Sequence, residues 1–150
     1  MKYVSERKDS LVIERDVTVP TRYGDHLFCD IFRPQSYLDK LFPIICYAPH
    51  GKQQRRKYFS ENLLHATGVQ PSHISEYARF EAADLAVFCP SGCSVINADI
   101  PGLWHGEGKA TFASPLEAEV SADLMEVIPF NSELTNSGQE HKRGAMETSD

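Results

Sequence analysis

The side chains best suited to chemistry are histidines and serines, which lie scattered along the chain. Acyl transfer by a catalytic triad needs a serine, a histidine and a carboxylate within hydrogen-bond reach of one another. His105 lies beside Trp104 in a loop with several glycines, whereas His65 and His73 lie in a long polar stretch. No pattern of spacing joins any of the three to a serine, so we predict surface or structural roles for them.

One serine has the spacing of a nucleophile elbow. In Gly92-Cys93-Ser94-Val95-Ile96, Ser94 follows a glycine by two residues. An elbow leaves a strand and enters a helix, but this segment leads into an apolar run typical of a strand. We therefore predict a loop before a strand, and no catalytic residue at Ser94.

The elements that would position these residues begin with a hairpin. Residues 11–19 have β-branched character and end at Pro20, a turn follows at 21–25, and residues 26–33 alternate. The alternation places Leu27, Cys29 and Ile31 on one face of the second strand. The segment predicts two antiparallel strands.

A strand–helix–strand pattern follows the hairpin. Residues 42–48 are apolar throughout, which predicts a strand buried on both faces of a parallel sheet. Residues 75–88 have helical spacing with Ser75 as a capping residue, and residues 93–98 form a second short apolar run. The fold class predicted is α/β, an antiparallel hairpin joined to a parallel βαβ unit in an incomplete sheet.

The last predicted element is a helix over residues 114–128. Ser114-Pro115-Leu116-Glu117 combines a capping serine, a proline at the first helical position and a glutamate three residues after the cap. We predict a domain over residues 11–130, an N-terminal tail over 1–10, and a disordered C-terminal tail over 131–150, which is rich in polar residues.

Six short motifs, in order, resemble those of the CocE/NonD family of α/β-hydrolases, which includes cocaine esterase and X-prolyl dipeptidyl-peptidase. The resemblance covers residues 11–128. The motifs are Asp30-Ile31-Phe32-Arg33-Pro34, Pro49-His50-Gly51-Lys52, Ser75 to Glu81, Asn97 to Gly102, Trp104 to Gly108, and the pair Glu119 and Asp123.

The resemblance implies acyl transfer to or from an ester or amide by a serine triad, without a metal or another cofactor. Members of the family place the nucleophile elbow after the helix that carries the last motif, and this chain shows none there. The resemblance therefore implies a hydrolase truncated before its nucleophile and inactive alone. Many relatives have, at the position of His50, a tyrosine whose hydroxyl donates a hydrogen bond in the oxyanion hole. His50 is therefore either a replacement donor or a residue that has lost this role.

Composition excludes several other classes. A net charge of −6 argues against a nucleic-acid surface, and no apolar run is long enough to cross a bilayer. The charged N-terminus has no signal-peptide character, which predicts a cytoplasmic protein. The four cysteines, Cys29, Cys46, Cys89 and Cys93, lack zinc-site spacing and are predicted to be structural thiols.

Three functions fit these observations. The chain is a serine-hydrolase-like protein without its own catalysis, a hydrolase-family component of a secondary-metabolite or toxin pathway, or an interaction module. In the third case an open sheet edge beside Cys93–Ala98 would pair with a copy or a relative, giving a homo- or hetero-oligomer. The same open edge predicts half-exposed Ile44, Cys46, Val95 and Ile96, and hence a marginally stable monomer.

Overall fold

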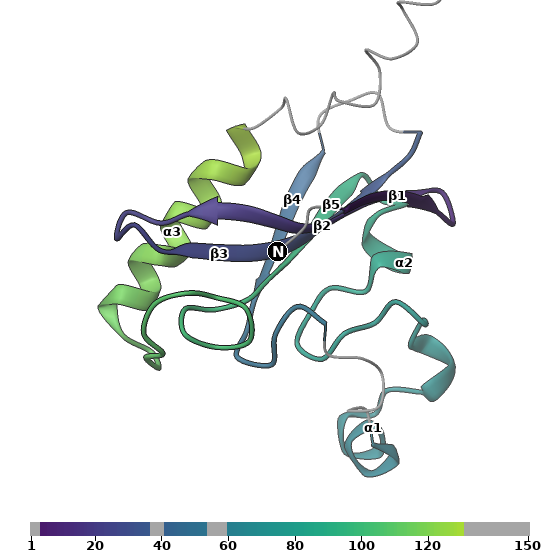
Figure 1. Ribbon diagram of the computed structural model, residues 1–150. Helices are drawn as coiled ribbons and strands as arrows, with labels where there is room; N and C mark the ends of the chain where they lie inside the picture. The colour runs from purple at the N-terminus through teal and green to yellow at the C-terminus, as the bar shows by residue number, and fades with distance from the viewer. Residues whose placement is uncertain (1–3, 37–40, 54–59, 131–150) are drawn as a thin grey trace, which may run out of the picture.

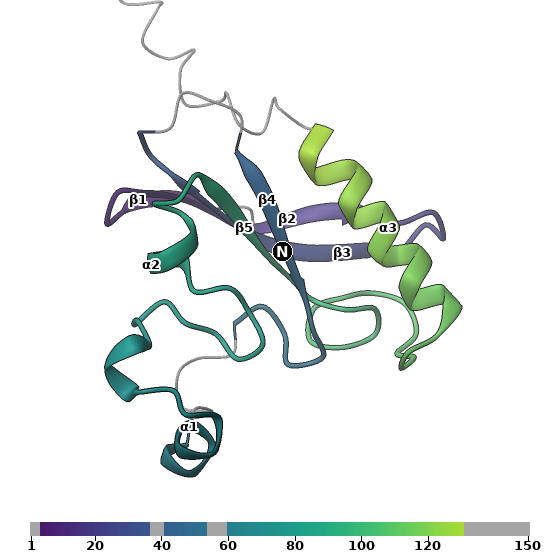
Figure 2. The same ribbon diagram turned by 180° about the vertical axis from the view of Figure 1, so that it is seen from behind.

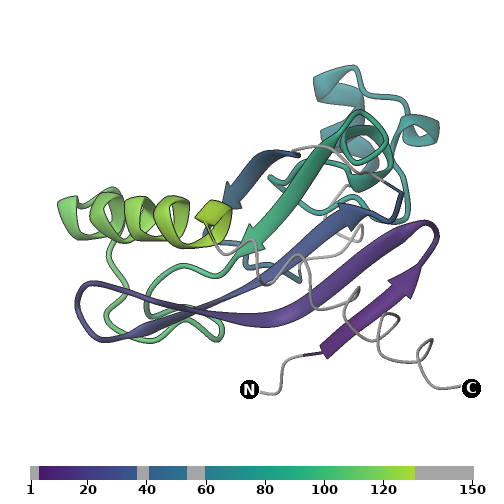
Figure 3. The ribbon, with the colours of Figure 1, turned by 90° about the horizontal axis from the view of Figure 1, so that it is seen from above.

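The computed structural model describes residues 4–36, 41–53 and 60–130, which fold around one mixed sheet (Figure 1). The strands lie in the order β1-β2-β3-β5-β4. β4 and β5 are parallel, and the other neighbours are antiparallel. Figure 3 shows β1 and β4 at opposite edges of the sheet. The strands are β1 (Val4–Lys8), β2 (Leu11–Pro20), β3 (His26–Pro34), β4 (Phe42–Tyr47) and β5 (Cys93–Ala98).

Two helices cover opposite faces of the sheet (Figure 2). Helix α3 (Pro115–Phe130) packs Val120 and Leu124 against the face that carries Ile96, and helix α2 (Leu85–Phe88) packs Leu85 against the face that carries Val95. Because successive strand residues point to opposite faces, β5 supplies both cores. A third helix, α1 (Glu61–Thr67), and a 3-10 turn, Pro71–His73, lie in the connection from β4 to α2.

The predicted strands at 11–19, 26–33, 42–48 and 93–98 and the predicted helix at 114–128 are confirmed within a few residues. The Ser114 hydroxyl accepts from the Glu117 N–H at 3.2 Å, as the capping pattern predicts. Residues 131–150, predicted to be disordered, lie outside the described residues. In the predicted tail, Val4–Lys8 form the exposed strand β1, which pairs with β2.

The predicted helix over residues 75–88 is wrong, because only its last turn, α2, is helical. The Arg79 guanidinium donates to the carbonyls of Glu76, Tyr77 and Ala78, which would otherwise accept helical N–H groups. Glu81 has a φ of 56°, in the left-handed region that ends a helix. Side-chain bonds therefore compete successfully with the helical pattern of apolar residues here.

The predicted open edge beside Cys93–Ala98 is also wrong. β5 lies between β3 and β4, so Val95 and Ile96 are fully buried. β4 is the edge strand instead, with Phe42 76% exposed and its later residues half-buried. The prediction that residues 42–48 are buried on both faces fails for the same reason. No helix among the described residues has the length and apolar character to cross a membrane.

Candidate functional site

A buried lysine joins three segments where β4 ends. The Lys52 ammonium is fully buried and contacts the carboxylates of Asp16 and Asp30, the latter at 2.9 Å. The Lys52 backbone N–H donates to Asp99 at 2.9 Å. The loop after β4 is therefore attached to β2, to β3 and to the residue that follows β5.

A β-bulge brings Asp16 to the lysine. The register of β2 against β3 shifts between Glu14 and Val17, and Asp16 has a φ of 56°. The Asp16 N–H donates to Asp30 at 3.1 Å, and the Arg15 guanidinium also pairs with Asp30. Asp30 thus has polar partners on several sides, which its near-complete burial requires.

The charge on Lys52 is stabilised against its burial. Burial alone would lower the pKa of the ammonium, but its hydrogen bonds to Asp16 and Asp30 outweigh that effect, and the net pKa is raised. A lysine protonated in this way cannot act as a base or a nucleophile at neutral pH. Its role in this fold is to hold the loop.

His50, the predicted oxyanion-hole candidate, lies in this same loop. Its Nε2 is 3.3 Å from a Glu81 carboxylate oxygen, and its ring meets Phe80 edge-on with centroids 4.7 Å apart. The His50 side chain is 44% exposed. The structure therefore places His50 at the carboxyl end of the parallel strands, where α/β proteins bind ligands, with one ring nitrogen directed to Glu81.

The loop after β5 lies against the loop after β4. Trp104 Nε1 donates to the Pro49 carbonyl at 2.9 Å, and His105 Nδ1 is 3.4 Å from the buried Asp99 carboxylate. Gly51 is required at this contact, because its φ is 77° and an added Cβ would lie 2.7 Å from the Trp104 ring. The half-exposed His105 ring therefore lies near the Asp99 carboxylate without a hydrogen bond to it.

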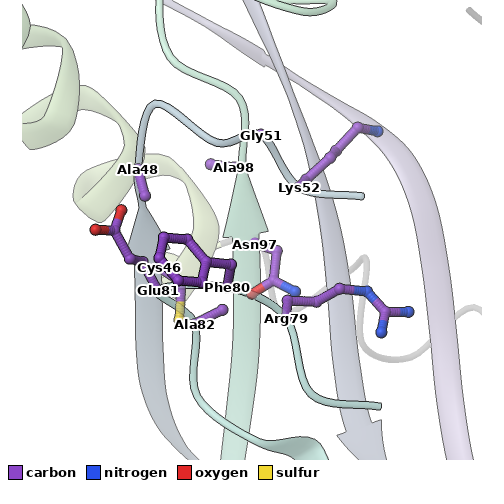
Figure 4. Close-up of a pocket in the computed structure, with 10 residues that line it drawn as sticks. All are labelled: Cys46, Ala48, Gly51, Lys52, Arg79, Phe80, Glu81, Ala82, Asn97 and Ala98. Carbon is purple, nitrogen blue, oxygen red and sulfur yellow. The ribbon is translucent and has the colours of Figure 1, made fainter. Parts of the chain in front are cut away.

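A small pocket opens between the loop after β4 and the segment before α2 (Figure 4). Its empty volume is about 210 Å³, including space open to solvent. Asn97 and Ala98 of β5 form its floor, Ala48 and Gly51 one wall, and residues 79–82 the other.

The remaining candidates from the sequence are not brought to this site. Ser94 lies at the start of β5, at the end of the strand away from the pocket, so the elbow reading is excluded by position. His65 and His73 are exposed in α1 and in the 3-10 turn. Within the described ranges, no serine hydroxyl is hydrogen-bonded to a histidine ring. The same residues contain no group of three His, Cys, Asp or Glu side chains that could hold a metal ion.

The last sequence motif forms a tether rather than a site. Asp123 of α3 accepts from the Arg22 N–H and from its guanidinium, both at 2.8 Å, and Glu119 accepts from the Tyr23 hydroxyl. The Arg22 hydrogen bond lowers the pKa of the Asp123 carboxyl. These bonds fix α3 to the turn between β2 and β3, at a separation of 101 residues that sequence spacing alone does not reveal.

Comparison with solved structures links this arrangement to a family. A crystal structure of a CocE/NonD family hydrolase from Staphylococcus aureus matches 77% of the chain at 25% identity, with a TM-score of 0.65. The predicted resemblance to CocE/NonD hydrolases is confirmed. A second crystal structure of that hydrolase matches 83% of the chain at 24% identity and a TM-score of 0.65. An α-amino acid ester hydrolase shares the fold, with 84% of the chain matched at 16% identity and a TM-score of 0.51.

The similarity is confined to part of those proteins. The chain spans 20–23% of the length of the solved structures it matches. No protein-family model matches the chain, and no curated protein matches it either. The likeness to CocE/NonD hydrolases therefore rests on the sheet and its loops.

The contact between Gly51 and Trp104 gives a direct test of the two loops. Gly51→Ala should change the fluorescence emission of Trp104, the single tryptophan, because the added Cβ displaces the ring from its hydrogen bond to Pro49. It should also cost about 1–2 kcal/mol for the left-handed backbone. Gly68→Ala is the matched control, since Gly68 has a φ of 71° and open space at its Cβ position. Equal emission spectra for the two variants would disprove the contact.

Proposed function

We propose that the chain is a serine-hydrolase-like module of the CocE/NonD type that supplies the oxyanion side of an acyl-hydrolase site and lacks the nucleophile. One observation carries the proposal. Lys52 is fully buried and holds the loop that presents His50 at the carboxyl end of β4 and β5. A donor to an oxyanion must be positioned before the reaction, and this loop is fixed from three sides.

The proposed chemistry is attack on an ester or amide carbonyl by a serine that this chain does not provide. The His50 ring would donate an N–H to the oxyanion, in the place that a tyrosine hydroxyl occupies in many relatives. Donation from Nε2 competes with the Glu81 contact, so the proposed donor is the other ring nitrogen or a His50 released from Glu81. The described residues alone then offer no route to an acyl-enzyme.

Hydrolysis of p-nitrophenyl acetate by the purified chain tests this proposal. We expect a rate that rises linearly with ester concentration and that differs little between the native chain and His50→Ala, since exposed imidazoles hydrolyse this ester without a site. Asn62→Ala, in the exposed part of α1, serves as a matched control. Saturable hydrolysis that one serine substitution abolishes would overturn the proposal.

A further inference from the structure

We propose that the pocket over Asn97 is a binding subsite for a small uncharged amide group. The inference goes beyond the acyl-hydrolase proposal and does not require it, because binding can be measured without turnover. It starts from a polar side chain whose hydrogen-bonding groups have no partner.

Asn97 is 2% exposed, and neither its Nδ2 nor its Oδ1 has a hydrogen-bond partner among the described residues. Buried side-chain amides nearly always have such partners, and each exception requires an explanation. An unused donor and acceptor on the same planar group are the two halves of an amide-binding pair. The side chain is therefore equipped for a ligand that this structure does not contain.

The position of Asn97 suits a ligand site. It lies near the carboxyl end of β5, paired with Cys46 of the parallel strand β4 and with Asp30 of β3. Ligands of α/β proteins bind at this end of parallel strands. Figure 4 shows Asn97 beside Phe80, with the Glu81 carboxylate and the Arg79 guanidinium pointing to opposite sides.

In this proposal a ligand enters by outward movement of the wall formed by residues 79–82. The wall is not helical, and Glu81 has a left-handed backbone that a non-glycine residue adopts at a cost. Two contacts of His50 link this wall to the loop after β4, one with the Phe80 ring and one with Glu81, and the His50 and Glu81 side chains are 44% and 50% exposed. Outward movement of Phe80 would open the Asn97 amide to the pocket.

The chemistry of Asn97 selects the ligand class. A carboxamide donates one N–H and accepts one hydrogen bond along a single edge, as asparagine does when it reads the edge of adenine. A primary or secondary amide offers the complementary pair. A charged group would have to leave water for a lining that carries both a cation, Arg79, and an anion, Glu81, so neither sign of charge is favoured. In this structure the pocket has room for about one water molecule, so an amide group of a larger molecule enters it only when Phe80 moves outward.

Titration of the ¹⁵N-labelled chain with acetamide tests the subsite. The titration should extend to about 100 mM, because a ligand with so few atoms binds weakly. We expect saturable shifts of the Asn97 side-chain NH₂ and of the backbone amides of Cys46 and Ala82, which line the same pocket. Asn97→Leu should abolish the shifts at Cys46 and Ala82 while the circular dichroism spectrum stays native, and Asn62→Ala should bind acetamide as the native chain does.

Three results of such titrations would overturn the proposal. They are the absence of saturable shifts, the same shifts in Asn97→Leu, or equal binding of sodium acetate, which would contradict an uncharged ligand. A long-lived water at Asn97 that acetamide does not displace would also overturn it, because the amide would then be satisfied internally. None of these results bears on ester hydrolysis, so the two proposals fail separately.

Discussion

Replacing Lys52 with methionine is expected to lower the free energy of unfolding by about 3–5 kcal/mol, as removal of one partner from a buried ion pair does. The loss arises because Asp30, which is 1% exposed, would keep its charge without its closest cation. Methionine fills a similar volume, so the effect of lost packing is small. Against a typical stability of roughly 5–15 kcal/mol, this is a large fraction.

Urea denaturation followed by circular dichroism measures this change. Lys8→Met is the matched control, because the Lys8 side chain is 57% exposed and its ammonium contacts the exposed Asp9 and lies 5.8 Å from the Tyr77 ring centroid. The control should stay within about 0.5 kcal/mol of the native chain. If the two methionine variants were equally stable, the buried lysine would not hold the loop.

Stability is expected to fall steeply at alkaline pH. Burial raises the pKa of the Cys29 thiol to about 12 and that of Cys89 to about 11. Unfolded cysteines release their protons near a pKa of about 8.5, so near pH 10 the folded chain binds about two more protons than the unfolded chain. The free energy of unfolding should then fall by about 2.7 kcal/mol for each pH unit. Lys52, whose pKa is also raised, acts in the same direction above its unfolded pKa of about 10.4.

Denaturant titrations between pH 7.5 and 10.5 in the presence of a reductant measure the slope. The double variant Cys29→Ala/Cys89→Ala should be less stable at neutral pH, because it leaves two cavities, but its stability should depend much less on alkaline pH. Cys93→Ala leaves both buried thiols in place and should keep the native slope. If the free energy of unfolding of the native chain did not change with pH in this range, the burial of these thiols would be contradicted.

The strands and the last helix could be predicted from the sequence because their signals are local. Alternation in residues 26–33 placed Leu27, Cys29 and Ile31 together, and the structure packs all three in one core. The helix predicted over residues 75–88 is wrong because the side chains of Arg79 and Asp84 hydrogen-bond to backbone groups that a helix would pair with each other. Periodicity cannot reveal such competition.

The site was predictable only in outline. The sequence singled out Pro49 to Lys52 and Asn97 to Gly102, and the structure brings these segments together at one edge. It did not reveal the role of Lys52, whose partners Asp16 and Asp30 lie 36 and 22 residues away. The available signal was Asp30, an acidic residue among apolar ones in a strand, which has to find a cation when buried. The bulge that presents Asp16 has no sequence signal that we can name.

The central claim is that Lys52 and Asp30 anchor the loop that carries His50. A double-mutant cycle with Lys52→Met and Asp30→Asn tests it most directly, with the free energy of unfolding measured for each variant. We expect a coupling energy of at least about 1.5 kcal/mol, within the range for residues in contact, with a shift of Trp104 emission in both single variants. Additive effects with unchanged emission would show that Lys52 and Asp30 do not hold the loop, and would contradict the account.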